Sequence, residues 1–264
     1  MSVLLRVAYD GTDFHGWARQ APDRDGVPTR TVQGELERAL AELCRQPVPV
    51  RGASRTDAGV HAAGQLASFE RVTPIPCENL VHAIGRALPR DVVVVDAWEE
   101  DGERDVRRSN AGKHYRYRIR EAELRDPTTI RYEWHLARTL ALGPMREAAA
   151  RFVGTHDFAS FRAAACQART TVRTIQAVDI VAVAPGLVDV HVHGLAFLHM
   201  MVRIMVGTLV EVGLGRMPPE HVDRLLAHPD RGAAGRTAPP SGLVLERVRW
   251  PGVDPSFAES GAPG

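Results

Sequence analysis

Strand-like and helix-like segments alternate along this chain, without the glycine fingerprint of a parallel βαβ unit. Apolar residues spaced as in strands predict strands at residues 3–9, 48–51, 65–70, 92–98 and 115–120, and a hairpin over 172–193 that turns at 184–186. A helical spacing predicts helices at residues 31–44, 79–87, 144–152 and 198–212. Hairpin-type turns among such mixed elements favour an α+β fold over a doubly wound parallel sheet.

A polar run at residues 99–107 is the best candidate for a domain boundary. We therefore expect an N-terminal domain at residues 1–103 and a second domain at residues 104–250, both of ordinary size. Residues 251–264 are rich in Gly, Pro, Ser and Ala, which predicts a flexible tail.

No segment reads as a targeting signal or a membrane span. The apolar residues after Met1 are interrupted at Arg6, unlike those of a signal peptide. The longest apolar stretch, residues 196–215, contains His199, Arg203 and Glu211, so it predicts a buried helix. The three cysteines form no Cys-x-x-Cys pair, which suits a reducing compartment. We expect a cytoplasmic protein with no membrane partner and no structural zinc.

The formal net charge of +1 does not by itself indicate a nucleic-acid-binding protein. However, Lys113 is the single lysine, so 32 of the 33 basic residues are arginines. Guanidinium groups suit phosphate oxygens and base stacking better than ammonium groups do. A genome-wide preference for arginine explains the same excess, so any RNA partner would have to bind a local patch.

The segment RGASRTDAGVHAAGQ, residues 51–65, is the most unusual in the chain. Three glycines surround a polar centre that contains Arg55 and Asp57, between two strand-like runs. Rigid loops of this kind commonly present a carboxylate for chemistry. The alternative is an Asx-turn, in which Asp57 only caps its own backbone.

Arg203 stands among apolar residues in the predicted helix 198–212, where His199 shares its face four residues earlier. If Arg203 is buried it requires an anionic partner, and the candidates are Asp57, Asp157 and Glu211. Alternatively, its guanidinium reaches the surface while its stem covers the core.

The strand at residues 115–120 alternates between aromatic and basic residues. Tyr115, Tyr117 and Ile119 share one face, and the other bears a row of basic side chains, namely His114, Arg116, Arg118 and Arg120. One interpretation is a base-stacking platform beside phosphate-binding arginines. The other is an amphipathic strand with its tyrosines in the core. Aromatic and basic residues also mix in the N-terminal loop, which fits either RNA contact or simple packing.

A rival site is the face formed by Asp189, His191 and His193 in the predicted hairpin. Such a face could supply ligands to a zinc ion, which would indicate a metal-dependent hydrolase. A solvated strand face is the commoner explanation.

Six segments in order along the chain resemble motifs of the TruA-type tRNA pseudouridine synthases. They are YDGTDFHGWARQ, RTDAGVHAAGQ, KHYRYRI, HDFASFRAAAC, FLHMMVRIMVGTLVEVG and APPSGLVLERV, which extend from Tyr9 to Val248. The resemblance implies a pseudouridine synthase fold with two domains, each built on an antiparallel sheet with helices on one face, and a cleft between them. It implies no metal, no organic cofactor, and a homodimer that binds tRNA.

The resemblance also implies the reaction and its residues. Uridines at positions 38, 39 and 40 in the tRNA anticodon stem-loop would be isomerised to pseudouridine. Asp57 takes the place of the catalytic nucleophile, Tyr115 that of the tyrosine stacked on the target base, and Arg203 that of the arginine paired with the aspartate. Arg55 matches an arginine linked to extrusion of the base.

The sequence departs from the family pattern at Ala18, Gly85 and Arg104, and in a long loop over residues 21–30. None of these positions is a proposed site residue. A tRNA-binding protein of the same fold without catalytic activity remains a further alternative.

Overall fold

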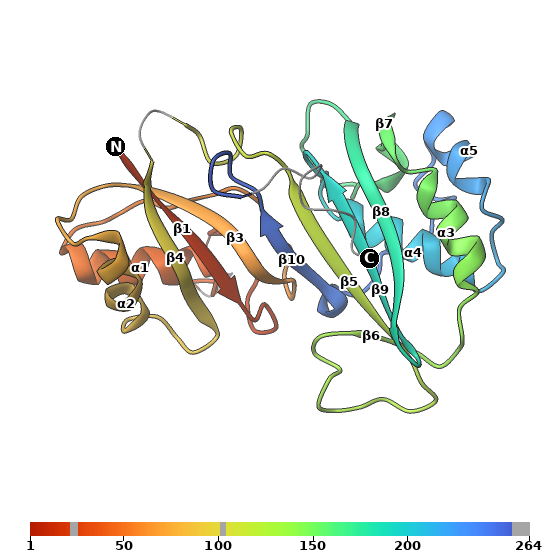
Figure 1. The fold of residues 1–264 in the computed structure, drawn as a ribbon, viewed down its shortest axis with the longest axis horizontal. Coiled ribbons are helices and arrows are strands. Elements are labelled where there is room, and N and C mark those ends of the chain that lie inside the picture. The colour runs from red at the N-terminus through yellow and green to blue at the C-terminus, as the bar shows by residue number, and fades with distance from the viewer. Residues whose placement is uncertain (22–25, 101–103, 255–264) are drawn as a thin grey trace. The chain divides into compact units, whose positions relative to one another are not determined.

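The computed structural model describes residues 1–21, 26–100 and 104–254 (Figure 1). The chain forms two compact units, residues 1–111 with the segment from 245 onward, and residues 112–244. These bounds differ from the predicted domains, since residues 104–111 and 245–250 belong to the first unit. Parts of the predicted boundary, of the long loop and of the predicted tail lie outside the described residues, at 101–103, 22–25 and 255–264. The two-domain organisation stays a prediction.

The first unit is built on a sheet with β1 (Ser2–Tyr9) between β4 (Val92–Glu100) and β3 (His61–Glu70), antiparallel to both. On its other side β3 pairs with β10 (Leu243–Val248), and the two-residue β2 (Arg51–Gly52) also pairs with β3. The strand predicted at 48–51 is therefore reduced to β2, whereas the one predicted at 65–70 begins earlier, at His61.

Two helices pack in this unit, α1 (Val32–Cys44) and α2 (Cys77–Gly85), with α2 against β4 and α1 against α2. Thr31 caps α1, because its Oγ1 accepts the Gly34 amide hydrogen at 3.2 Å. Arg45, at φ 54°, ends the helix in the left-handed region. The buried stripe of α1 consists of Val32, Leu36, Ala39 and Leu40.

In the second unit four strands are successive antiparallel neighbours: β5 (Lys113–Glu121), β9 (Leu187–Gly194), β8 (Val172–Ala184) and β7 (Gly154–Asp157). The short β6 (Trp134–Leu136) pairs with β5 in parallel. The predicted β8–β9 hairpin is confirmed, with Gly186 at φ 67° in its turn.

Helix α3 (Leu142–Ala150) packs against β8 and against α4 (Met201–Gly213), and α5 (His221–Ala227) contacts β7 (Figure 1). Short 3₁₀ turns occur at Ala159–Phe161 and Pro240–Gly242. Every residue of α4 except Arg203 and Glu211 is buried, which confirms a core helix. The α+β character predicted from the sequence is confirmed. No helix among the described residues is long and apolar enough to cross a bilayer.

Candidate active site

The loop at residues 53–60 presents Asp57, and buried polar contacts hold its backbone. The fully buried side-chain amide of Gln65 accepts the Ser54 N–H at 3.1 Å and donates to the Ser54 carbonyl oxygen at 2.7 Å. Val60 N–H donates to the Asp57 carbonyl oxygen at 3.2 Å, which closes a turn. Arg55 is exposed at this loop and Asp57 is half-buried. The 53–60 loop is therefore anchored at its base, while Asp57 remains partly accessible.

The loop that follows β1 packs against the 53–60 loop. Tyr9 Oη lies 2.7 Å from Thr56 Oγ1, and Trp17 N–H donates to the Thr56 carbonyl oxygen at 3.1 Å. Gly16 adopts φ 95°, and a Cβ there would lie 2.7 Å from the same carbonyl oxygen, so the approach requires glycine. Phe14 and Trp17 are buried, which supports the packing interpretation for these two aromatic residues. Two sequence motifs more than 40 residues apart thus form one structure.

Strand β5 confirms the predicted alternation. Tyr115, Tyr117 and Ile119 are buried, and the intervening basic residues are half-buried. The Tyr115 ring meets Phe197 edge-to-face, with centroids 5.1 Å apart, and Tyr117 Oη donates to the Pro239 carbonyl oxygen at 2.8 Å. Burial raises the pKa of Tyr117 far above its ordinary value, an effect that the nearby guanidinium groups of Arg203 and Arg236 oppose. Tyr117 is therefore a neutral core residue.

Arg203 lies in the first turn of α4, not in the middle of a longer helix as predicted. The helix begins at Met201, after Met200 turns the chain at φ 59°. His199 precedes this turn and is exposed, so the predicted shared helical face with Arg203 is wrong. Arg203 is half-buried, and its Nε donates to the Ala238 carbonyl oxygen at 2.8 Å. The predicted ion pair with Asp57 stays a prediction.

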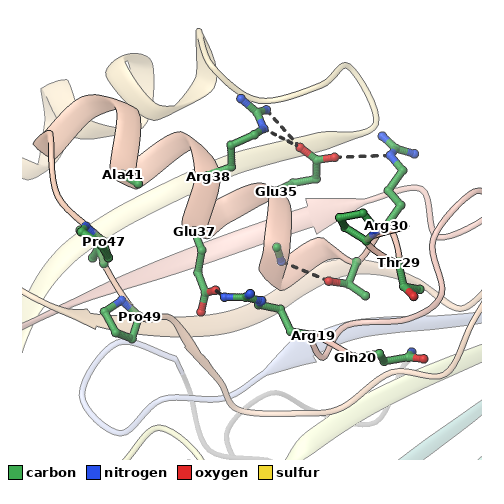
Figure 2. A pocket seen from close by; sticks show the side chains of 14 residues that line it. Arg19, Gln20, Thr29, Arg30, Glu35, Glu37, Arg38, Ala41, Pro47 and Pro49 are labelled. Atoms are coloured by element: carbon green, nitrogen blue, oxygen red, sulfur yellow. Dashed lines mark hydrogen bonds and ion pairs between the residues drawn. The ribbon is translucent and has the colours of Figure 1, made fainter. Parts of the chain in front are cut away.

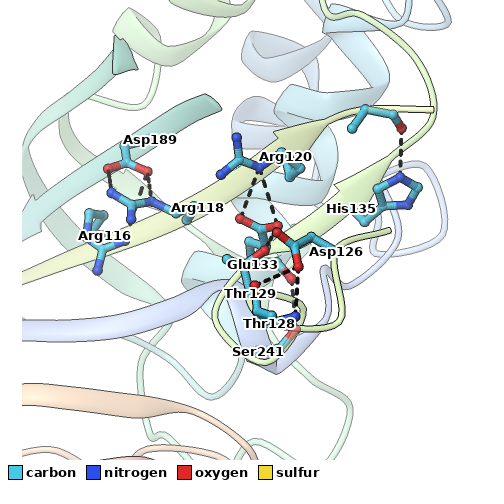
Figure 3. A network of polar contacts seen from close by, with 11 residues as sticks. Arg116, Arg118, Arg120, Asp126, Thr128, Thr129, Glu133, His135, Asp189 and Ser241 are labelled. Atoms are coloured by element: carbon cyan, nitrogen blue, oxygen red, sulfur yellow. Dashed lines mark hydrogen bonds and ion pairs between the residues drawn. The ribbon is translucent and has the colours of Figure 1, made fainter. Parts of the chain in front are cut away.

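The rival metal site is occupied by an arginine. Arg118 Nε and Nη2 donate to Asp189 Oδ1 and Oδ2 at 2.8 and 2.7 Å, so both carboxylate oxygens of this buried residue are engaged (Figure 3). The His114 and His193 rings stack at 4.0 Å, and His114 Nε2 lies 3.0 Å from His191 Nδ1. Within residues 1–21, 26–100 and 104–254, no group of three or more potential ligands could hold a metal. The strand face formed by Asp189, His191 and His193 is therefore part of a polar side-chain network, and not the solvated face that was the commoner expectation.

A pocket of about 760 Å³ lies beside α1 in the first unit (Figure 2). Its three arginines are each paired with a carboxylate: Arg19 with Glu37 and Arg30 with Asp91 at 2.9 Å, and Arg38 with Glu35 at 3.0 Å. The arginines of this pocket are therefore neutralised by carboxylates, and its lining contains none of the predicted site residues.

Sequence reasoning missed the residues that support the 53–60 loop. In the sequence, Gln65 stands at the start of one predicted strand and Tyr9 at the end of another. A polar amide within an apolar strand is the available signal, because a buried amide requires hydrogen-bond partners. The backbone groups that the Gln65 amide contacts depend on the register of β3 with its neighbours. The residue pattern of one strand does not determine that register.

Comparison with known proteins agrees with the motifs. A family model described as tRNA pseudouridine synthase matches residues 6–107 and 148–251. The chain is 44% identical over 249 residues to tRNA pseudouridine synthase A of Geobacter sulfurreducens, covering 94% of this chain and 99% of the relative. It is 46% identical over 251 residues to the protein of the same name from Syntrophotalea carbinolica, covering 95% and 97%. The counterpart from Myxococcus xanthus is 42% identical over 259 residues, covering 98% and 96%. On this evidence the chain belongs to the tRNA pseudouridine synthase family.

Proposed function

We propose that this protein isomerises uridine to pseudouridine in tRNA, at positions 38, 39 and 40 of the anticodon stem-loop, with Asp57 as the nucleophile. The observation that carries the proposal is the family match over residues 6–107 and 148–251. That match includes the 53–60 loop, where a partly accessible carboxylate-bearing residue lies on an anchored backbone. Anchoring of this kind is what precise placement of a reacting group requires.

The reaction rearranges one nucleoside without any net gain or loss of atoms. The bond between C1′ and N1 breaks, the uracil turns, and a bond forms between C1′ and C5. C5 loses a proton and N1 gains one, so the balance requires no oxidant, reductant or organic cofactor. A carboxylate fits three roles in this reaction: attack on C1′, attack on C6, or removal of the C2′ proton. We assign whichever role is used to Asp57.

Three further residues contribute to substrate binding in this proposal. The target base must leave its stack, which costs a few kcal/mol that protein contacts must offset. Tyr115 stacks on the extruded base, and the exposed Arg55 assists extrusion. Arg203 adds its charge to the positive end of the α4 dipole, so this helix end attracts an anion such as a carboxylate or a phosphate.

The test is release of tritium from tRNA labelled at C5 of uridine. Wild type is expected to release tritium without added metal or cofactor, and Asp57→Asn to release none while keeping the wild-type melting temperature. Asp13→Asn is the matched control, because Asp13 is an exposed aspartate in the loop that packs beside the 53–60 loop. Bound tRNA without tritium release from wild type would contradict the proposal and favour a non-catalytic binding protein.

The homodimer implied by the family resemblance and the cytoplasmic location expected from the cysteine pattern belong to the same proposal. The mass of the native protein by light scattering tests the first, because a monomer at micromolar concentration would contradict it. Fractionation of cells that express the full chain tests the second.

A further inference from the structure

The second unit contains a small pocket of about 280 Å³ where three arginines converge. Arg138 follows β6, Arg216 follows α4, and Arg236 precedes the 3₁₀ turn at Pro240–Gly242. The single acidic residue in its lining is Glu211, near the C-terminal end of α4. None of these four residues belongs to the proposed catalytic set.

The charge of this pocket is not balanced. Glu211 pairs with Arg216: the Arg216 Nη1 lies 3.0 and 3.3 Å from the two carboxylate oxygens of Glu211. Arg138 and Arg236 are exposed, and among the described residues neither has a carboxylate partner. The pocket therefore has a formal charge of +2 from its side chains. The pocket in Figure 2 differs in this respect, because each of its arginines is paired with a carboxylate.

Arg236 is also held in place before any ligand binds. Its guanidinium carbon lies 4.7 Å from the ring centroid of Trp134, a buried residue of β6. Stacking of this kind orients the planar guanidinium and lowers the entropy lost when it binds an anion. Its N–H groups remain available to a ligand.

We infer that this pocket binds a backbone phosphate of the tRNA substrate, an inference that rests on the proposed function. Guanidinium forks match phosphate oxygens in geometry and charge. The volume is below the range of roughly 300–1,000 Å³ typical of small-molecule sites, which suits one phosphate group of a larger ligand. Glu211, which lines the pocket, follows Arg203 by eight residues on α4, or about 12 Å along the helix axis. One tRNA molecule is therefore large enough to contact both the pocket and Arg203.

The experiment measures binding of an unmodified tRNA transcript at several salt concentrations, together with tritium release. We compare wild type with Arg138→Gln, Arg236→Gln and the double variant. Losing one phosphate contact should lower the slope of log affinity against log salt by about 1. We expect the double variant to bind roughly tenfold more weakly at low salt, a change near 1.4 kcal/mol. At saturating tRNA its turnover should match wild type, because neither residue is assigned to the chemistry.

Arg224→Gln is the control, since Arg224 is an exposed arginine of α5 in the same unit. An unchanged affinity and salt slope in the double variant would overturn the inference, and so would an equal loss in the control. If Arg236→Gln unfolds for lack of the Trp134 contact, Arg138→Gln alone decides, because that side chain is exposed. Weaker binding in the variants without tritium release from wild type would refute the proposed activity but not the pocket.

Discussion

The amide of Gln65 offers a direct test of how the protein positions Asp57. Gln65 is fully buried in β3, and its side chain both accepts from and donates to the backbone of Ser54, at 3.1 and 2.7 Å. Gln65→Met replaces the amide with an unbranched apolar chain of similar length. The substitution therefore removes two hydrogen bonds at the base of the 53–60 loop and leaves the packing of β3 nearly unchanged.

The expected cost follows from the two backbone groups that lose the amide. Each buried group left unsatisfied costs about 1–3 kcal/mol, so the pair costs about 2–6 kcal/mol. Removing a buried amide recovers part of this, and we expect a net loss of about 3 kcal/mol in the free energy of unfolding. For a protein of this size the melting temperature should fall by about 6–12 °C. A loop displaced by about 1 Å should lower kcat by up to roughly 100-fold.

Calorimetry measures the melting temperature, and tritium release at saturating tRNA measures kcat. The control is Gln20→Met, because Gln20 is exposed and its amide donates to the His15 carbonyl oxygen, at 2.7 Å. We expect the control to change the free energy of unfolding by no more than about 0.5 kcal/mol. If Gln65→Met melts at the same temperature as wild type, the Gln65 amide does not stabilise the fold as we expect. Lower stability with unchanged kcat would show that the amide does not position Asp57.

Three further predictions concern other parts of the fold. Gly16→Ala places a Cβ 2.7 Å from the Thr56 carbonyl oxygen at φ 95°, and should cost about 1–3 kcal/mol in chemical denaturation and lower kcat. Burial raises the pKa of Tyr117 above its ordinary value of 10.0, so the unfolded chain ionises first and stability is lost as pH rises above about 10. Tyr117→Phe should flatten this alkaline loss in urea titrations from about pH 8 to about pH 11, and an equally steep loss would contradict it. Asp189→Asn weakens the paired bonds to Arg118 and should destabilise the protein by about 1–3 kcal/mol, whereas chelators should leave wild-type turnover unchanged.

Local patterns in the sequence were sufficient for most of the secondary structure. The Thr31 cap, the buried stripe of α1 and the alternation in β5 all depend on side chains a few residues apart. The β8–β9 hairpin is equally local, because its turn and its strands are adjacent in the chain. Predicted ends were less accurate, as at α4, where the left-handed Met200 delays the helix start to Met201. The motif order along the chain was sufficient for the family.

Contacts between distant segments required the tertiary structure. Asp57 stood out in the sequence, but its support by Gln65 and Tyr9 depends on the register of β3 and on the fold of the N-terminal loop. The Asp-x-His-x-His pattern resembled a metal site until Arg118 was found on both oxygens of Asp189. No pattern in the sequence predicted the pocket formed by Arg138, Arg216 and Arg236. Local propensity acts over a few residues, whereas charge pairing and burial depend on which distant side chains share the same space.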